Sequence, residues 1–113
     1  MVSWSQAKAL ALALPEAAEA DHFGSPSFRV RGKIFMQLSS EDETAPRATL
    51  KLAAADQSAL LMTDPETFVS VPGWGKHGWT WVYLHHVDEG LFAGLLRQAW
   101  KQVAPKKLVA ETG

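Results

Sequence analysis

The chain has 113 residues, of which 47% are hydrophobic and 20% are charged, and its formal net charge is −1 at pH 7. This length and composition predict one globular domain over residues 1–113, and the near-neutral charge excludes an overall basic field that attracts nucleic acid or anionic lipid. The absence of cysteine excludes disulfides, a thiol nucleophile and thiolate metal sites. No stretch approaches the ~20 apolar residues of a membrane helix, so we expect a soluble, cytoplasmic protein.

The first predicted element is a helix that starts after Ser3 and stops at Pro15. Ser3 and Gln6 have the spacing of a capping box. Apolar residues then recur at helical spacing on one face, at Trp4, Ala7, Ala11 and Leu14. Proline ends the helix because it has no backbone N–H to donate.

Strand patterns follow. Residues 17–23 alternate between charged and apolar side chains and predict a half-buried strand, which a turn at Gly24-Ser25-Pro26 ends. Two further strands are predicted at 27–30 and 33–38, joined by Arg31-Gly32 as a two-residue hairpin turn.

The segment 39–46 predicts a solvated loop because it contains three consecutive acids, residues 41–43, and Pro46. A metal site or a site for a basic partner is the alternative interpretation of the acids. Residues 47–52 alternate again and predict a strand with Leu50 and Leu52 facing inward.

Three helix starts are predicted in the second half. Asp56 caps a short helix that runs through Leu61, and the segment 63–66 is a second start signal with proline near the first turn. Asp88 caps the last long helix, which Pro105 ends. Its apolar stripe consists of Phe92, Leu95, Leu96, Ala99 and Val103.

The window 71–81 has the most unusual composition, with three of the five tryptophans and three of the eight glycines. It predicts a glycine-hinged loop that leads into a strand. In that strand Trp79, Trp81 and Tyr83 share one face, and Thr80, Val82 and Leu84 share the other. Because both faces are apolar, we expect an interior strand. We expect Trp81 in the core and Trp74 partly exposed, with an aromatic binding platform as the alternative.

The order of these elements predicts an α+β fold. Strands cluster in the middle of the chain and helices flank them, which is typical of a two-layer sandwich. We expect an antiparallel sheet of about five strands with the helices packed mainly on one face.

Several of these segments resemble the MmcQ/YjbR family of small bacterial proteins. The similarity lies in four segments and runs over nearly the whole chain in the family's order: His22–Val30, Gly32–Phe35, Pro72–Trp81 and Ala104–Leu108. The resemblance implies a compact α+β fold with an antiparallel sheet. It also implies a proposed DNA-binding role based on a double-wing shape, and it carries over no enzymatic activity or cofactor.

The residues themselves predict no catalytic, cofactor or metal site. A nucleophile needs a base beside it, and no serine here has such a neighbour in the sequence. Asp21 and His22, like His85 and His86, are consecutive in an extended chain and therefore point to opposite faces. A pair such as His22 with His77 remains open, although a hydrogen-bonded structural histidine is the simpler interpretation.

Basic residues suggest a nucleic-acid site. Arg29, Arg31, Lys33 and Lys76 lie in or beside glycine-containing turns, and Trp74 and His77 lie in the tryptophan loop. A second basic cluster near the C-terminus consists of Arg97, Lys101, Lys106 and Lys107. Basic groups beside tryptophan can hold phosphates and stack bases. The alternatives are a solvated hairpin and helix-dipole complementarity.

We therefore expect a small, non-enzymatic binding protein with DNA as its leading partner. The alternative is a homodimer interface or a small-ligand module on the aromatic strand face. The sequence leaves monomer and homodimer open.

Overall fold

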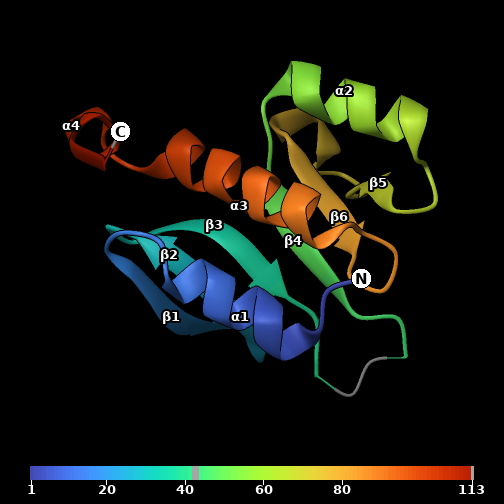
Figure 1. Cartoon of the computed structure of the whole chain (residues 1–113), viewed down its shortest axis with the longest axis horizontal. Helices are drawn as coiled ribbons and strands as arrows, with labels where there is room; N and C mark the ends of the chain where they lie inside the picture. Colours follow the sequence, from blue (N-terminus) through green and yellow to red (C-terminus); the bar gives the residue numbers. More distant parts are fainter. Residues whose placement is uncertain (42–43, 113) are drawn as a thin grey trace.

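The computed structural model describes residues 1–41 and 44–112, and Figure 1 shows the arrangement of the elements. Asp42 and Glu43 of the predicted acidic loop lie outside the described residues. The elements in chain order are α1 (Trp4–Leu12), β1 (Ala17–His22), β2 (Ser25–Val30), β3 (Lys33–Leu38), β4 (Arg47–Lys51), α2 (Ala54–Thr63), β5 (Phe68–Ser70), a 3-10 turn (Gly75–His77), β6 (Trp79–Tyr83), α3 (Glu89–Val103) and α4 (Lys106–Thr112).

The strands form one antiparallel sheet in the order β1-β2-β3-β4-β6-β5. As predicted, β6 is an interior strand, because Trp81 pairs with Thr49 of β4 on one side and with Val69 of β5 on the other. The described sheet has six strands rather than about five, since residues 68–70 pair with β6 instead of only leading into the loop. The α+β fold and the antiparallel sheet are confirmed.

All four described helices contribute to a core on one side of the sheet. The stripe of α3 packs on β3 and β4, with Phe92, Leu96 and Ala99 buried. Trp100, which the predicted stripe omitted, is also buried and donates its indole N–H to the Pro15 carbonyl at 3.0 Å. The predicted capping box of α1 is present, because the Gln6 N–H donates to the Ser3 hydroxyl at 3.0 Å.

The turn between β1 and β2 differs from the prediction. Phe23 and Gly24 form it, with φ of 52° and 84°, and β2 already begins at Ser25, which pairs with His22. Two consecutive positive φ values suit a tight two-residue hairpin. The predicted turn at 24–26 was wrong. Glycine and proline indicate that a turn is near, but they do not determine which residues of the two strands pair. The Arg31-Gly32 turn is confirmed, with φ of 52° and 82°.

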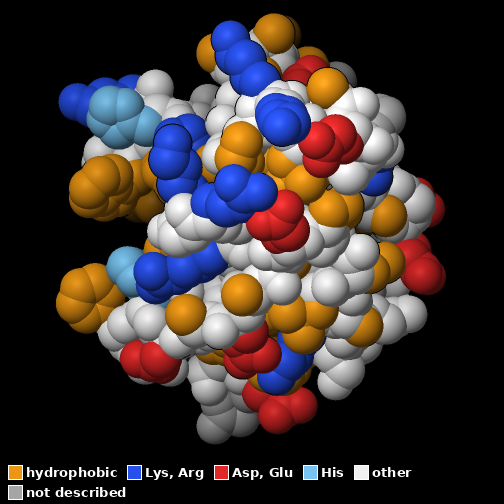
Figure 2. Space-filling model, turned by 90° about the vertical axis from the view of Figure 1, so that its left-hand side faces the viewer, with side chains coloured by type: hydrophobic (Ala, Val, Ile, Leu, Met, Phe, Trp, Pro, Cys, Tyr) orange, Lys and Arg blue, Asp and Glu red, His pale blue; other side chains and the backbone are white. Residues whose placement is uncertain are grey.

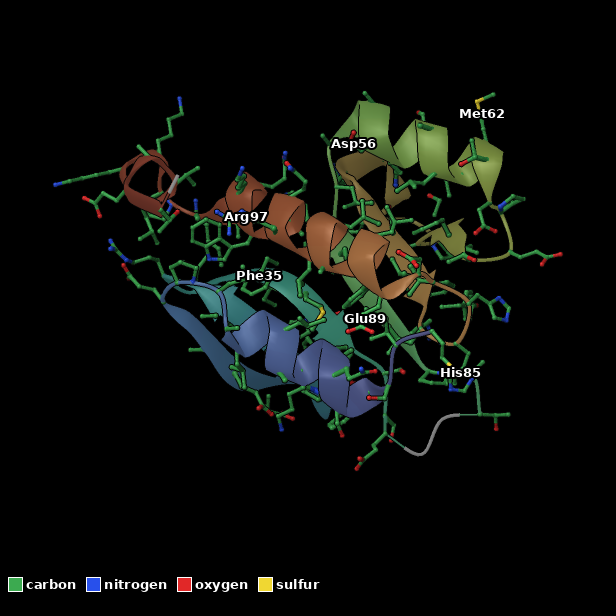
Figure 3. The ribbon with its side chains drawn as sticks, in the orientation of Figure 1. Phe35, Asp56, Met62, His85, Glu89 and Arg97 are labelled. Carbon is green, nitrogen blue, oxygen red and sulfur yellow. The ribbon has the colours of Figure 1, made fainter. Side chains whose placement is uncertain are left out.

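A β-bulge interrupts the pairing of β2 with β3. Phe28 pairs with Met36 and Arg29 pairs with Ile34, so Phe35 is the extra residue. Phe35 and Met36 are therefore both buried, although they are neighbours on one strand. Figure 3 shows Phe35 between the sheet and α3, while Met62 points outward from α2. The bulge lets one strand fill the core twice in succession.

Two predicted helix starts were wrong. The N-cap of α2 is Ala53, and Asp56 lies in the first turn. A carboxylate there still stabilises the helix, because it lies at the positive end of the helix dipole. The segment 63–66 begins no helix, because Asp64 caps the end of α2 and its backbone carbonyl accepts the Phe68 N–H in a turn into β5.

After Pro105 the chain forms a further helix, α4, which was not predicted and whose Leu108 joins the core. None of the described helices has the length and hydropathy to cross a membrane.

Candidate functional site

The side of the sheet opposite the helices forms an open face. Cross-strand register places Trp79, Trp81 and Tyr83 of β6 on it, beside the side chains of Lys51, Thr49 and Arg47 of β4. The alternate residues Thr80, Val82 and Leu84 are buried on the helix side. The expectation that Trp81 lies in the core was wrong, because the described helices all cover the other face and leave Trp81 half-buried.

Cations stack on the tryptophans of the open face. The Arg47 guanidinium lies 4.5 Å from the Trp81 ring centroid, and the Lys51 ammonium lies 5.5 Å from the Trp79 centroid. The negative face of each ring attracts the cation above it. The open face thus presents positive charge and aromatic surface together.

The described strands place no carboxylate on this face. Strands β2 to β6 contain neither Asp nor Glu. In β1, Glu19 reaches Lys8 of α1 at 3.1 Å and so lies on the helix side, and Asp21, two residues further along, shares that side. The described strand residues that face this side therefore include cations and no carboxylate, although the formal net charge of the chain is −1.

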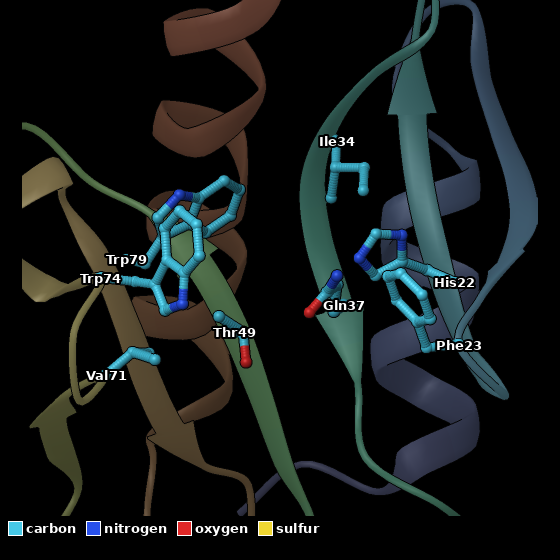
Figure 4. Close-up of a pocket in the computed structure, with 8 residues that line it drawn as sticks. All are labelled: His22, Phe23, Ile34, Gln37, Thr49, Val71, Trp74 and Trp79. Atoms are coloured by element: carbon cyan, nitrogen blue, oxygen red, sulfur yellow. The ribbon is translucent and has the colours of Figure 1, made fainter.

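A half-open groove of about 400 Å³ lies on the open face. Phe23 and His22 line one wall, Trp74, Trp79 and Val71 line the other, and Ile34, Gln37 and Thr49 form the floor (Figure 4). Phe23 is 96% exposed and Trp74 is 59% exposed. The partial exposure expected for Trp74 is confirmed. Each exposed aromatic ring has a histidine beside it.

The twist of the sheet explains how two distant segments line one groove. Register places the Phe23-Gly24 turn at the corner of β1 and β2, and the loop before Trp79 at the diagonally opposite corner, at β6 and β5. A twisted sheet is saddle-shaped, so diagonally opposite corners rise on the same face. The bulge in β3, which lies between these corners, increases the local twist.

The tryptophan loop is held by hydrogen bonds. The side-chain amide of Gln57 in α2 donates to the Gly75 carbonyl at 2.9 Å and to the Thr80 hydroxyl at 3.0 Å. The Leu52 N–H donates to the Gly78 carbonyl at 2.9 Å. Gly78 has a φ of 93°, and a Cβ there would overlap the Leu52 carbonyl, so only glycine fits. The loop therefore holds Trp74 at a fixed position beside the groove.

The opposite wall is a strained hairpin tip. Phe23 adopts a φ of 52°, which is uncommon for a bulky residue. Its ring makes an edge contact with His22 at a centroid distance of 4.7 Å, and Asp21 accepts the Gly24 N–H at 3.3 Å. Backbone strain concentrates at functional sites, and this tip combines strain with an exposed aromatic ring.

The structure brings several predicted basic residues to the same end of the sheet. Register places the Arg31-Gly32 turn and Lys33 at the end where the tryptophan loop with Lys76 and His77 lies. Lys33 and Lys76 are exposed, and within the described residues neither forms an ion pair. Arg29 is half-buried on the open face, where its Nε–H donates to the Ser27 hydroxyl at 3.1 Å.

Arg31 differs from the other basic candidates because it already has a carboxylate partner. It donates two hydrogen bonds to Glu16, at 2.7 and 3.0 Å. This contact lowers the pKa of the Glu16 carboxyl and raises the pKa of the Arg31 guanidinium. A phosphate at Arg31 would have to displace Glu16, so Arg31 is the weakest of the predicted phosphate ligands.

Lys106 and Lys107 are exposed on α4. The charge of Glu111 in α4 also raises the pKa of Arg31, which indicates that α4 lies near the β2–β3 turn. Figure 2 faces this side of the molecule and shows Lys and Arg side chains gathered in a band, with a few acidic groups among them. These two lysines thus flank the end of the sheet rather than lining the groove.

The described residues contain no group of three His, Asp or Glu side chains placed to hold a metal ion. His22 lies in one wall of the groove, and His77 lies beside Trp74 of the other, at a centroid distance of 6.4 Å. His85 and His86 lie beyond the far end of β6, next to Tyr83.

Sequence reasoning missed several residues of the site. Phe23 was missed because the turn was predicted at 24–26, one residue further along the chain. Residues 47–52 were described only by the inward-facing leucines, so Arg47, Thr49 and Lys51 were not predicted as site residues. Gln37 was missed because the apolar residues Ile34, Phe35 and Met36 identified its strand. The alternation in residues 47–51 carried the signal for β4, because basic and polar side chains occupy every second position there.

Comparisons with known proteins agree with this architecture. The model of the YjbR family matches residues 12–102. A search of solved structures found the crystal structure of Deinococcus radiodurans protein DR2400, which has the family-model domain DUF419, with a TM-score of 0.83 and 20% identity. The match covers 95% of this chain and 82% of that one, and at this identity it shows the fold alone. No curated protein matches the chain.

Proposed function

This chain belongs to the YjbR family, and we propose that it binds nucleic acid, with unpaired DNA as the preferred form, on the open face of its sheet. The observation that carries the proposal is the pair of exposed rings, Phe23 and Trp74, on opposite walls of a groove whose sheet face carries cations and no carboxylate. Single strands bind in this way, through aromatic side chains that stack bases and a positively charged surface that follows the backbone.

Lysine and arginine side chains would contact the phosphates of the nucleic-acid backbone. Arg29 and Lys51 lie on the open face, and Lys33 and Lys76 are exposed at the end of the sheet beside the groove. These four groups are the proposed phosphate ligands. The overall charge of −1 gives no long-range attraction, so we expect affinity that is micromolar or weaker at physiological salt.

The exposed rings favour unpaired over paired bases. In a duplex the base faces are already stacked on one another and are closed to Phe23 and Trp74. An unpaired base exposes both faces, and stacking on an aromatic side chain contributes ~1–3 kcal/mol per base. Binding to single strands should therefore exceed binding to a duplex of the same sequence.

The test is fluorescence anisotropy of labelled single-stranded and duplex DNA over a salt series. For about four phosphate contacts, the slope of log K against log salt should be about −3 for the single strand. Lys33→Ala should weaken binding of all sequences alike and reduce the slope by about one phosphate contact. Absence of binding to either form at low salt would refute the proposal.

Stacking is tested with Phe23→Ala and Trp74→Ala. Each should weaken single-strand binding several-fold and change duplex binding less. Met62→Ala is the matched control, because Met62 is 84% exposed on α2, away from the groove. If all three variants bind like the unsubstituted protein, the rings do not contact the ligand.

A small planar ligand is the second candidate occupant, because a volume of about 400 Å³ lies in the range typical of small-molecule pockets. The aromatic anion 1-anilinonaphthalene-8-sulfonate is a suitable probe. Binding of this probe that Trp74→Ala abolishes, in a protein that binds no oligonucleotide, would favour this candidate over nucleic acid.

A further inference from the structure

The floor of the groove carries two polar side chains beside Ile34, whereas both walls are mostly apolar. Gln37 of β3 and Thr49 of β4 are direct cross-strand partners and lie side by side between the two walls (Figure 4). Both side chains are half-buried. Within the described residues, neither the Gln37 amide nor the Thr49 hydroxyl forms a hydrogen bond, so their donors and acceptors are available to a ligand.

We propose that this floor reads one unpaired base, so that the protein distinguishes between bases instead of binding every single strand equally. The inference rests on the proposed function and adds the chemistry of recognition. Phe23 and Trp74 hold the faces of the base, and Gln37 and Thr49 contact its edge. Apolar walls with a few placed polar groups are the usual composition of a selective site.

The chemistry of the two side chains suits a base edge. The Gln37 amide presents a carbonyl acceptor and an N–H donor next to each other, and the Thr49 hydroxyl both donates and accepts. A glutamine amide makes paired hydrogen bonds to the neighbouring donor and acceptor of adenine. Unpaired bases are generally read in this way, by stacking on their faces and hydrogen bonds on their edges.

The rigid position of one wall supports selectivity. The loop that carries Trp74 is fixed by Gln57 and by the Leu52–Gly78 hydrogen bond, and the floor lies on two paired strands of the sheet. A base clamped against a fixed ring can approach the floor in few orientations. A mismatched edge then leaves the amide unpaired, and an unpaired half-buried polar group lowers affinity.

The experiment compares oligonucleotides of equal length and charge made of adenine, cytosine or thymine alone, together with an abasic strand. Because backbone contacts are identical, differences in affinity report the bases. We expect the strongest and weakest of the three base-bearing strands to differ about fivefold or more. We expect the abasic strand to bind more weakly than any of them.

Two shape-conserving substitutions identify the groups that read the base. Gln37→Met and Thr49→Val remove hydrogen bonds and keep side-chain size, and Gln98→Met on the exposed side of α3 is the control. Gln37→Met should reduce the difference between bases to less than about twofold, and Thr49→Val should reduce it in part. Gln98→Met should leave it unchanged. Circular dichroism establishes that each variant is folded.

The outcomes separate this inference from the proposed function. Equal affinity for all three bases, with a weaker abasic strand, would overturn base reading and leave the nucleic-acid proposal intact. A preference that survives both Gln37→Met and Thr49→Val would also overturn it. Absence of binding to every strand at low salt would overturn both proposals together.

Discussion

Gln57 of α2 donates its side-chain amide to the backbone carbonyl of Gly75, 2.9 Å away and in the middle of the tryptophan loop. The same amide reaches the Thr80 hydroxyl, which in turn donates to the Gly78 carbonyl at 3.1 Å. A single side chain thus joins a helix, the loop and the first residues of β6. Together with the Leu52–Gly78 hydrogen bond, this connection fixes the loop that carries Trp74.

Removal of this amide should loosen the loop. Gln57→Ala leaves the buried Thr80 hydroxyl without a donor and leaves the Gly75 carbonyl with the Gly78 N–H as its remaining donor. We therefore expect a loss of about 1–3 kcal/mol in the free energy of unfolding. Urea denaturation measures the change. Ser58→Ala, at an exposed position of the same helix, is the control and should change stability by less than about 0.5 kcal/mol. Equal midpoints for the two variants would contradict the role of Gln57.

The two loop glycines should differ in their tolerance of alanine. At Gly78 a Cβ overlaps the Leu52 carbonyl, whereas at Gly73 it meets no described atom within 4 Å, and both residues have positive φ, at 93° and 78°. Gly73→Ala should cost about 1 kcal/mol through backbone strain alone. Gly78→Ala should cost clearly more, because the backbone must also move. Thermal or urea unfolding ranks the pair, and the reverse order would be inconsistent with this loop geometry.

Buried and exposed tryptophans should differ in the stability cost of substitution by alanine and in the quenching of their fluorescence by iodide. Trp100 is fully buried, so Trp100→Ala should cost about 3–5 kcal/mol. Trp81 is half-buried beneath Arg47, so Trp81→Ala should cost only about 1–2 kcal/mol. Iodide should quench Trp74 strongly and Trp100 hardly at all, which variants with single Trp→Phe changes can resolve. Equal costs for Trp81→Ala and Trp100→Ala would restore the earlier expectation of a core position for Trp81.

The ion pair between Glu16 and Arg31 should be visible in an acid titration. Because hydrogen bonding to Arg31 lowers the folded-state pKa of Glu16, its stabilisation is complete above the ordinary pKa of glutamate. It disappears as the pH falls through the lowered value. Both groups are exposed, so the effect on stability is small and decreases with salt.

The carboxyl carbon resonance of Glu16, followed by NMR, measures this shift directly. Arg31→Gln should move the midpoint up toward the ordinary value for glutamate. Lys33→Gln removes an equal charge two residues away and should leave the midpoint in place. A midpoint that does not respond to Arg31→Gln would show that the pair does not form in solution.

Local patterns predicted most of the elements. The apolar stripe of α3 and the capping box of α1 depend on residues three or four apart, and the Arg31-Gly32 turn depends on two neighbours, so nearby residues carry the information. The interior position of β6 followed from apolar residues on both faces. The prediction failed at Phe23-Gly24, where the pairing of His22 with Ser25 sets the position of the turn. It also failed at 63–66, where the residues that resemble a helix start form the end of α2 and the turn into β5.

The sequence by itself determined that Trp79, Trp81 and Tyr83 share one face of an interior strand, because side chains alternate along any strand. Only the tertiary structure decided that the helices cover the other face, since alternation defines two sides and does not say which one is buried. The groove depends still more on tertiary structure. Residues 23 and 74 line it because the twist of the whole sheet raises two diagonal corners, and no local pattern contains that curvature.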